Sequence, residues 1–523
     1  MYDYVVVGAG SAGSVLAARL SEDPDVHVAV IEAGPHDTAD EIHLPVAFSS
    51  LFKSPLDWDL DTEPEAQLYG RRAYLPRGRV LGGSSSMNAM IYIRGARADY
   101  DGWAAGGADG WSYDEVLPYF LRSEDNERGK DAYHGVDGPL TVSNSRSGNA
   151  LAEAFVAAAE QAGFTHNDDF NGATQLGVGR YQLTQRNGMR CSAAVAYLHP
   201  VLDRPNLTVI TDALAHKVVF DGDRATGVLI GRGAQTELIS ARREVVLSAG
   251  TYGSAQLLLL SGVGPAEQLG TFGIEAVREL PVGQNLQDHL SVFLNYRTDR
   301  ESLMTALTAE NLALLREAGR GPLTSNVGEA GGFFQTRPDL AGPDVQLHQA
   351  PVLFYAEGMG PAVTHGFALG PCLVAPTSRG EVTLRSAAPA TAPRIRHNYL
   401  DTEEDRASLL AGLRIALSIA DQPALREVTA GEFLVPASDS DADLLDFARR
   451  TAQTLYHPTS TCAIGAVVDP RLRVLGLRGL RVADASVMPT VVRGNTNAPT
   501  IMIGEKAAAM IIEDADSEGK PRQ

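Results

Sequence analysis

Residues 2–32 read YDYVVVGAGSAGSVLAARLSEDPDVHVAVIE. The run Tyr2–Val7 is apolar and rich in β-branched residues, which favours a buried strand. After a glycine-rich turn, Ser14–Leu20 has helical composition, and Val26–Ile31 is a second strand-like run that ends at Glu32. This order of strand, turn, helix and strand is typical of the first unit of a Rossmann-type sheet. We therefore expect an α/β fold.

The turn carries the pattern G-x-G-x-x-G at Gly8, Gly10 and Gly13, and Glu32 follows about 20 residues further on. The first glycine permits the tight turn, the second lets a pyrophosphate approach the backbone, and the third lets helix and strand pack closely. The phosphate then lies at the positive end of the helix. Glu32 would accept a hydrogen bond from a ribose hydroxyl, and an acid there disfavours a 2′-phosphate. The motif predicts a dinucleotide and leaves NAD and FAD open.

Length and composition exclude several other classes. The 523 residues correspond to two to four structural units, with 44% hydrophobic and 21% charged residues, as in soluble globular proteins. With 44 Lys+Arg against 64 Asp+Glu, the net charge of −20 opposes binding to a nucleic-acid backbone. No nucleic acid partner is expected.

The three cysteines, Cys191, Cys372 and Cys462, are far apart and show no metal-ligand spacing, so we expect neither a disulfide framework nor a metal site. Tyr2–Val7 leaves no room for a signal peptide, and apolar runs such as Ala255–Leu260 are shorter than a transmembrane segment requires. We expect a cytoplasmic protein, either a monomer or a homo-oligomer.

Further glycine-rich blocks follow along the chain. GRVLGGSSSMN, residues 78–88, is flanked by apolar residues 89–93 and by three arginines, which suits an ordered loop against an anionic or ring-shaped ligand. A second block, GTYGSAQLLLLSGVG at residues 250–264, follows an apolar strand at 245–247. Near the C-terminus, LRVADAS at residues 480–486 reads as a strand that ends in an acid, and GNTNAP at residues 494–499 precedes the helix-like run 500–512.

These blocks, together with PVGQNLQDH at residues 281–289, resemble the glucose-methanol-choline (GMC) family of FAD-dependent oxidoreductases. The resemblance extends from about residue 2 to about residue 513, and Ala255 is one departure, at a position where proline is common. Within the family, the sequences of these blocks are most similar to those of bacterial alcohol and choline dehydrogenases and their oxidase relatives. The resemblance selects FAD over NAD.

The resemblance implies a discontinuous Rossmann-type FAD-binding domain made of residues 1–160, 195–290 and 450–515. Residues 161–194 and 291–449 would form an α+β substrate-binding domain with an antiparallel sheet. Composition agrees, with helical spacing at Thr305–Ala318 and Glu403–Ile419 and strand-like runs at Asp344–Leu353 and Arg379–Leu384. We expect residues 514–523 to form a frayed tail.

The resemblance also implies which residues contact FAD. They are Gly8, Gly10, Ser11, Ala12, Gly13, Glu32, Ala33, Arg79, Leu81, Gly82, Gly83, Ser84, Asn88, Ala89, Met90, Ala215, Asp484, Ala485, Thr496 and Asn497. Met87 stands where some relatives carry a histidine that bonds FAD covalently, so we expect noncovalent FAD. Ala89 stands where certain choline-oxidising relatives carry a serine.

A catalytic pair is implied at His457 and Asn495. Hydride loss from an alcohol carbon becomes easier when the hydroxyl proton leaves to a base, and histidine suits that role. Asn495 would hold the substrate oxygen, although Asn497, assigned to the flavin side, could exchange roles with it. The family usually reads HPxGTCxMG, and here Ser460 replaces a glycine and Ile464 a methionine. We expect His216, His289 and His397 to be structural.

The predicted function is FAD-dependent oxidation of a primary alcohol to the aldehyde, with reoxidation by O2 or another acceptor. Two alternatives remain, a choline-type quaternary-ammonium alcohol as substrate and a non-redox flavoenzyme such as a lyase or photoenzyme. Glu329 and His348 are candidate pocket residues, and Glu329 could either attract an ammonium group or serve as a structural hydrogen-bond acceptor. Phe333, Phe334, Phe354 and Tyr355 could supply the aromatic cage that choline requires.

Overall fold

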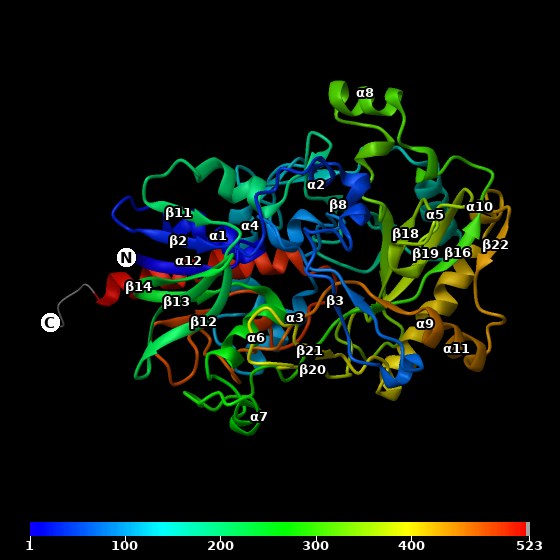
Figure 1. The fold of residues 1–523 in the computed structure, drawn as a ribbon. Coiled ribbons are helices and arrows are strands. Elements are labelled where there is room, and N and C mark those ends of the chain that lie inside the picture. The colour runs from blue at the N-terminus through cyan, green and yellow to red at the C-terminus, as the bar shows by residue number, and fades with distance from the viewer. Residues whose placement is uncertain (519–523) are drawn as a thin grey trace.

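Two sheets organise the protein, for which a computed structural model describes residues 1–518 (Figure 1). The strands of the first sheet are β1 (Tyr2–Val7), β2 (Val28–Ile31), β11 (Leu207–Ile210), β12 (Leu214–Asp221), β13 (Arg224–Arg232), β14 (Gln235–Leu247) and β24 (Leu480–Val482). Their order is β11-β2-β1-β14-β13-β12, and β24 also pairs with β14. This seven-stranded sheet confirms the predicted α/β class with a Rossmann-type start.

The long strand β14 joins two kinds of pairing. Its second half runs parallel to β1 and β24, with Val245 opposite Val5 and Leu480. Its first half pairs antiparallel with β13, which pairs with β12. The parallel part β11-β2-β1-β14-β24 therefore carries the nucleotide-binding topology, and the hairpins extend it at one edge.

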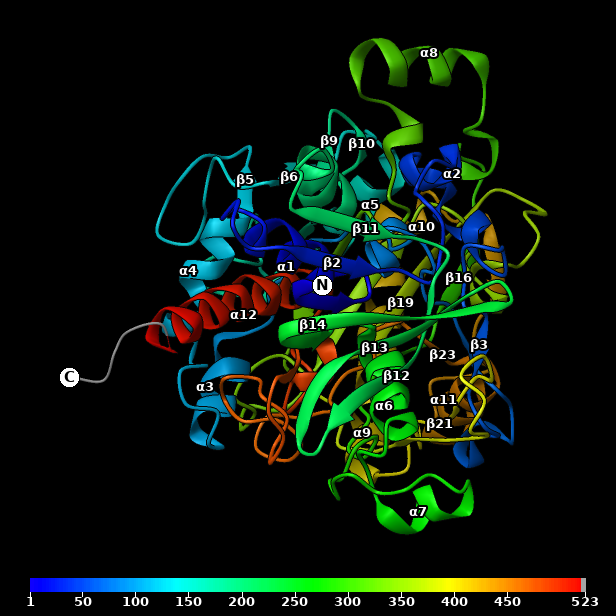
Figure 2. The same ribbon diagram turned by 60° about the vertical axis from the view of Figure 1, so that its left-hand side comes forward.

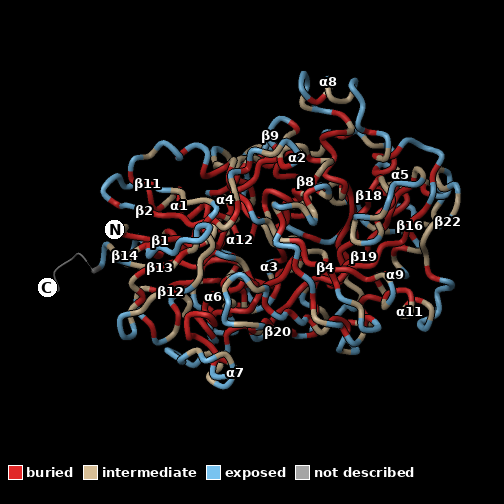
Figure 3. The backbone as a smooth tube through the Cα atoms, viewed as in Figure 1, coloured by how far each residue is buried: buried red, intermediate tan, exposed pale blue. Residues whose placement is uncertain are grey.

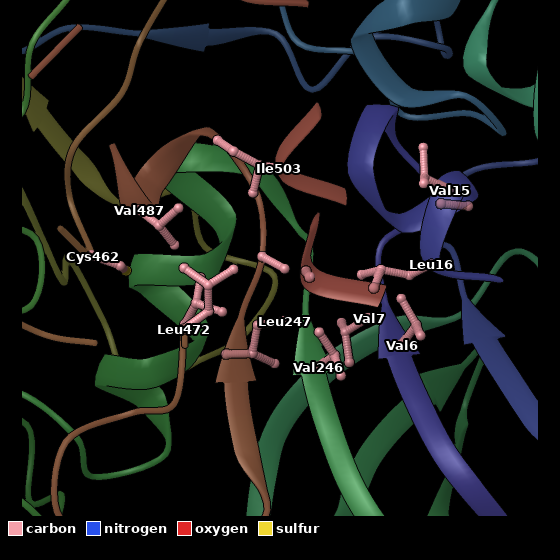
Figure 4. Packing of buried hydrophobic residues seen from close by; sticks show 14 of the residues in the cluster. Val6, Val7, Val15, Leu16, Val246, Leu247, Cys462, Leu472, Val487 and Ile503 are labelled. Carbon is pink, nitrogen blue, oxygen red and sulfur yellow. The ribbon is translucent and has the colours of Figure 1, made fainter. Parts of the chain in front are cut away.

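Apolar strands alternate with apolar helices in this part of the structure. Val6, Val7, Val246 and Leu247 are buried in the sheet, and Leu16 of α1 (Ser11–Leu20) packs against them, as Figure 4 shows. Helix α12 (Asn497–Glu518) lies beside α1 (Figure 2). The β-branched run explains the strand, and burial on both faces explains why it is continuously apolar rather than alternating.

The second sheet is antiparallel throughout. Its strands are β7 (Gly177–Arg180), β15 (Leu290–Ser291), β16 (Leu294–Arg297), β17 (Ala330–Phe334), β18 (Val345–Ala350), β19 (Gly366–Leu373), β22 (Gly431–Leu434) and β23 (Gln453–Thr454). Their order is β22-β16-β19-β18-β17-β7, with β15 between β19 and β23. The predicted antiparallel sheet is therefore present.

Helices cover this second sheet. Helix α9 (Glu403–Ala420) packs on β18 and β19, and α5 (Ala150–Gln161) packs on β7, β17 and β18. Helix α8 (Ala309–Ala318) stands away from the body and is largely exposed (Figures 1 and 3). It begins later than the spacing predicted, because Thr308 caps it by accepting from the Asn311 N–H.

Smaller elements complete the chain. The other helices are α2 (Asp40–His43), α3 (Arg97–Ala105), α4 (Tyr113–Ser123), α6 (Gly250–Leu260), α7 (Ala266–Thr271), α10 (Pro423–Arg426) and α11 (Asp441–Thr451). Short strands are β3 (Leu60–Asp61), β4 (Tyr74–Leu75), β5 (Glu124–Asn126), β6 (Leu140–Asn144), β8 (Gln182–Leu183), β9 (Gln185–Arg186), β10 (Met189–Arg190), β20 (Glu381–Thr383) and β21 (Arg394–Arg396). Among the described residues, no helix combines the length and apolarity needed to cross a membrane.

Two segments pack against a different sheet from the one to which we assigned them. Helix α5, placed with residues 1–160, buries Leu151 and Phe155 in the core of the second sheet. The hairpin β20–β21, placed with residues 291–449, buries Val382 and Ile395 in the core of the first. An apolar helix face shows that it is buried but not against which sheet. The other domain boundaries stay predictions.

The predicted frayed tail differs from the structure at its start. Residues 514–518 continue α12, and Asp514 forms ion pairs with Arg471 and Arg481. These long-range partners fix the end of the helix. Residues 519–523 of the predicted tail lie outside the described residues.

Candidate active site

A cavity of about 390 Å³ is lined by residues of both sheets and their loops. Its lining includes the turn between β1 and α1 and the end of β2. It also includes His348 of β18, the segment Leu455–Pro458 and Asn495. The G-x-G-x-x-G turn and the predicted catalytic pair therefore open onto the same cavity, although they are more than 400 residues apart in sequence.

The glycine turn can accept a pyrophosphate. Gly8 has a φ of +98°, and a Cβ there would lie 2.4 Å from the Ser248 carbonyl oxygen, so the tight turn requires glycine. A Cβ on Gly13 would lie 1.8 Å from the Gly8 oxygen. A Cβ on Gly10, by contrast, would meet no atom nearer than 3.9 Å and would project beside the cavity that Gly10 lines. No side chain caps α1, whose first N–H groups are therefore available to phosphate oxygens.

Glu32 lies at the end of β2, in the cavity wall. Its Oε2 accepts from the Ala9 N–H at 3.0 Å and its Oε1 from the Gly34 N–H at 2.9 Å. These bonds fix the carboxylate, and burial raises the pKa of Glu32 to about 7. Glu32 thus lies in the cavity wall, and its bond to a ribose hydroxyl stays a prediction.

The loop at residues 78–88 packs against the glycine turn. A Cβ on Gly83 would lie 2.8 Å from the Gly10 Cα, so the two loops approach closely enough to require glycine. The buried Arg190 holds the loop by donating to the carbonyl oxygens of Ser85 and Asn88, and to Asn88 Oδ1. Burial without an acidic partner lowers the pKa of Arg190 to about 9. Sequence analysis did not identify this residue.

Most predicted FAD-contacting residues line the cavity. They are Gly8, Gly10, Ser11, Ala12, Glu32, Ala33, Gly83, Ser84, Asn88, Ala89, Met90, Ala215, Asp484, Ala485, Thr496 and Asn497. Four do not line it. Gly13 serves the packing of α1, Gly82 and Leu81 shape the loop from behind, and Arg79 lies over the ring of Trp58, which does line the cavity.

His457 is held from its backbone side by Asp288. The Asp288 carboxylate accepts from the His457 N–H at 2.8 Å, and also from the hydroxyl groups of Tyr399 and Thr454 at 2.5 Å each. Asp288 lies in the block at residues 281–289 that carried part of the family resemblance, although its role could not be deduced from sequence. The anchored backbone directs the imidazole into the cavity wall.

Asn495 faces the Nε2 ring nitrogen of His457. The Asn495 Nδ2 lies 3.3 Å from His457 Nε2, and the Asn495 Oδ1 accepts from Gln346 Nε2 at 3.1 Å. Gln346 thereby orients the amide so that its NH2 group faces His457. Asn497 lies elsewhere, where its Oδ1 accepts from Ser11 Oγ at the start of α1. The structure thus brings His457 and Asn495 together as predicted.

The imidazole of His457 is neutral around pH 7. Burial lowers the pKa of His457 well below its usual range, and the neighbouring His289, His348 and Arg77 act in the same direction. A neutral ring keeps one nitrogen lone pair available to accept a proton.

We expected His289 to be structural, and the structure places it in contact with His457. Its Nδ1 lies 3.0 Å from the Nδ1 of His457, with the two rings almost perpendicular at 87°. Histidines 168 residues apart are brought into contact only because β15 and β23 pair side by side. The contact lies directly against the candidate base.

Ser460, which replaces the family's glycine, adopts a φ of +79°. This left-handed conformation is where glycine is usual. The Ser460 Oγ lies 2.8 Å from Thr459 Oγ1, and the Ser460 N–H donates to the Ala485 carbonyl. The serine therefore adopts a backbone conformation in which glycine is more usual.

Aromatic and aliphatic side chains form the cavity wall near His457. They are Phe48, Phe52, Phe293, Val327, Ala350, Phe354 and Leu455. Phe52 contacts Phe48 and Tyr456 edge-to-face, with centroids 5.8 and 5.6 Å apart. Of the predicted aromatic cage, Phe354 lines the cavity, whereas Phe333, Phe334 and Tyr355 do not. Phe48 and Phe52, from a short 3-10 helix and its end more than 400 residues before His457, were not anticipated.

Glu329 does not line the cavity, which corrects its assignment as a pocket residue. Its side chain is fully buried and accepts hydrogen bonds from Ser147 Oγ and Ser325 Oγ at 2.6 and 2.5 Å. The structural alternative for this carboxylate is therefore the one the geometry fits. His348 does line the cavity, and burial lowers its pKa to about 3.

Comparison with known proteins agrees with this architecture. The family model described as GMC oxidoreductase matches in two parts, an N-terminal model over residues 2–291 and a C-terminal model over residues 376–504. The chain belongs to the GMC oxidoreductase family. The family resemblance inferred from the glycine-rich blocks is confirmed. As a GMC protein the chain is an FAD-dependent oxidoreductase that acts on CH–OH donors.

Several GMC relatives match over nearly their whole length. An uncharacterised GMC-type oxidoreductase of Mycobacterium tuberculosis is 49% identical, covering 97% of this chain and 99% of the relative. A protein named alcohol dehydrogenase [acceptor] from Pseudomonas putida is 44% identical, over 99% and 96%. An oxygen-dependent choline dehydrogenase of Brucella melitensis is 42% identical, over 98% and 95%.

Solved GMC structures share the fold. Pyridoxine 4-oxidase from Mesorbium loti superposes with a TM-score of 0.91 at 32% identity, covering 98% of this chain and 99% of that one. A variant of Aspergillus oryzae formate oxidase gives a TM-score of 0.93 at 26% identity, over 99% of each chain. The glycine turn at Gly8, Gly10 and Gly13 (the glycine cradle), together with Glu32 and the uncapped start of α1, fits FAD, the cofactor of the family.

Proposed function

We propose that this GMC protein oxidises an uncharged, largely apolar primary alcohol to the aldehyde. One observation carries the proposal: a neutral His457 and Asn495 lie 3.3 Å apart at the apolar end of the cavity onto which the glycine cradle opens. In this proposal the Nε2 of His457 accepts the hydroxyl proton, and the Asn495 amide donates to the same oxygen. Noncovalent FAD supplies the acceptor for the hydride.

His457 and Asn495 have different roles at the substrate oxygen. The amide has no lone pair basic enough to compete for the proton, so it orients the hydroxyl without removing its hydrogen. As negative charge grows on the oxygen, the hydrogen bond that the Asn495 N–H donates to it strengthens, which favours the transition state over the ground state. The aromatic wall keeps bulk water from the base.

The charge around His457 supports an uncharged substrate over a quaternary ammonium. Within the described residues, the acidic groups that line the cavity are Glu32 and Asp484, and both hydrogen-bond to loops of the nucleotide end. The Asp288 carboxylate lies close to His457 but does not line the cavity, and it accepts from the His457 N–H and from two hydroxyl groups. Arg77 does line the cavity, and its guanidinium donates to the Tyr456 carbonyl at 2.7 Å. The charged group that the cavity presents beside His457 is therefore a cation, and Glu329 is sequestered, so neither would attract a quaternary ammonium.

Anaerobic stopped-flow reduction of the bound flavin tests the proposal without involving the electron acceptor. An aliphatic alcohol, benzyl alcohol and choline are compared as substrates, and choline should reduce the flavin most slowly. His457→Ala should keep FAD but slow reduction by about 10²–10⁴-fold, the scale of a lost general base. A His457→Ala variant that reduces its flavin at the wild-type rate would refute His457 as the base. Wild-type protein whose flavin is reduced by none of these alcohols would favour the non-redox alternative.

A further inference from the structure

The contact between His289 and His457 constrains where their protons can lie. Both rings are buried, and their Nδ1 atoms face each other at 3.0 Å. A neutral imidazole carries one N–H, so one of these nitrogens donates and the other accepts. Two arrangements of protons satisfy the contact, and they have opposite consequences for the cavity.

In the first arrangement His457 donates from Nδ1, which leaves its Nε2 as a free lone pair facing Asn495 and the cavity. In the second arrangement His289 donates, so His457 must carry its hydrogen on Nε2 and cannot accept a proton there. Only the first tautomer can act as a base at the atom that meets the substrate.

The surroundings of His289 favour the first arrangement. Burial lowers the pKa of His289 to about 4, so the ring is neutral and has an acceptor nitrogen. The Asn495 Nδ2 hydrogens face His457 Nε2 at 3.3 Å, so His457 carries its hydrogen on Nδ1 and His289 carries its own on Nε2. Asp288 acts on the same ring as a charge. A hydrogen on Nε2 leaves Nδ1 free to accept from His457.

The other groups around His457 leave its Nδ1 to His289. Asn495 faces Nε2, and Asp288 contacts the backbone N–H. Arg77 acts on the ring through its charge, and His348 lies close enough to disfavour protonation of both rings together. Within the described residues, the hydrogen-bond partner of Nδ1 is therefore His289 alone.

We propose that His289 is a positioning residue that holds His457 in its productive tautomer by accepting a hydrogen bond from Nδ1. The proposal rests on the proposed function, because it concerns the same base. When His457 takes the alcohol proton, its Nδ1–H still donates to His289, so the new imidazolium keeps a partner in a buried site. His289 itself neither gains nor loses a proton in the step.

Three replacements at position 289 separate this role from packing. Asparagine places an amide oxygen near the position of Nδ1, glutamine moves the amide one methylene further, and leucine removes the acceptor. We expect His289→Leu and His289→Gln to slow anaerobic flavin reduction by about 10–100-fold, the scale of leaving a buried N–H without a partner. His289→Asn should reduce its flavin at a rate close to wild type.

A double-mutant cycle with His457→Ala gives the decisive readout. If His289 acts only through the imidazole of His457, the leucine replacement has no further effect once that ring is gone. FAD content and melting temperature are measured for each variant, and the asparagine–glutamine pair serves if leucine does not fold. Equal slowing in both backgrounds, or no slowing in the wild-type background, would overturn the proposal. Failure of the proposed function differs, because His457→Ala alone would then reduce its flavin normally.

Discussion

Adding one methyl group to Gly10 should remove FAD without harming the fold. Gly10 has an ordinary extended conformation, with a φ of −79°, and its Cβ would have no neighbour within 3.9 Å. Gly10→Ala therefore costs the empty protein little. In the FAD complex the same carbon would occupy the path by which the pyrophosphate reaches the first N–H groups of α1.

The size of the effect follows from the bonds that would be lost. Two hydrogen bonds to a charged phosphate contribute about 1.5–3 kcal/mol each, so their loss weakens FAD binding by about 10²–10⁴-fold. The ratio of flavin to protein absorbance after purification, and titration of stripped protein with FAD, measure this loss. The melting temperature of the FAD-free protein should stay close to that of FAD-free wild type.

Gly13→Ala is the matched control, since it adds the same methyl group three residues later. Its Cβ would lie 1.8 Å from the Gly8 oxygen, which forces α1 away from β1. Overpacking of this kind costs about 1–3 kcal/mol or more, so the FAD-free protein itself should melt earlier. The reasoning is refuted if Gly10→Ala retains full FAD content, or if it destabilises the FAD-free protein as much as Gly13→Ala does.

Three further predictions concern charge and attachment. Because the pKa of His457 lies well below its usual range, the base is already deprotonated near neutrality, so flavin reduction should fall only as pH drops through that low pKa; a rate that still rises between pH 7 and 9 contradicts this. Glu329→Gln should lower stability by about 1–3 kcal/mol through weakened bonds to Ser147 and Ser325, yet leave the ranking of alcohol substrates unchanged in the stopped-flow panel. Since Met87 cannot form the family's covalent link, acid precipitation should leave yellow FAD in the supernatant, and flavin found in the pellet would contradict noncovalent binding.

The strand, turn and helix at the start of the chain were predictable because their causes are local. A β-branched run, three spaced glycines and an acid at the end of the next strand need no distant partner to be interpreted. The structure gives β1 the predicted bounds and places Gly8, Gly10 and Glu32 in the cavity wall. His457 and Asn495 were found for a different reason, since each lies within a block that resembles the family.

Other parts of the site depend on contacts between distant segments. Glu329 is a residue type that could line a pocket. Only the structure shows that it instead accepts hydrogen bonds from two serines away from the cavity. Helix α5 is amphipathic in sequence, but the sheet that covers it is chosen by packing. Non-local pairing cannot be deduced from periodicity, because many surfaces offer the same apolar complement.

The nucleotide-binding start, the family and FAD could be predicted from the sequence, and the candidate base could be proposed from it, because each is encoded in contiguous residues with fixed spacing. Three features of the site are visible only in the folded structure. They are the contact of His289 with His457, the orientation of Asn495 by Gln346 and the apolar wall that includes Phe52. These features arise where β15 meets β23 and where loops from both sheets converge. A hydrogen bond depends on tenths of an ångström between atoms, and for residues far apart in sequence only the packed fold sets that distance.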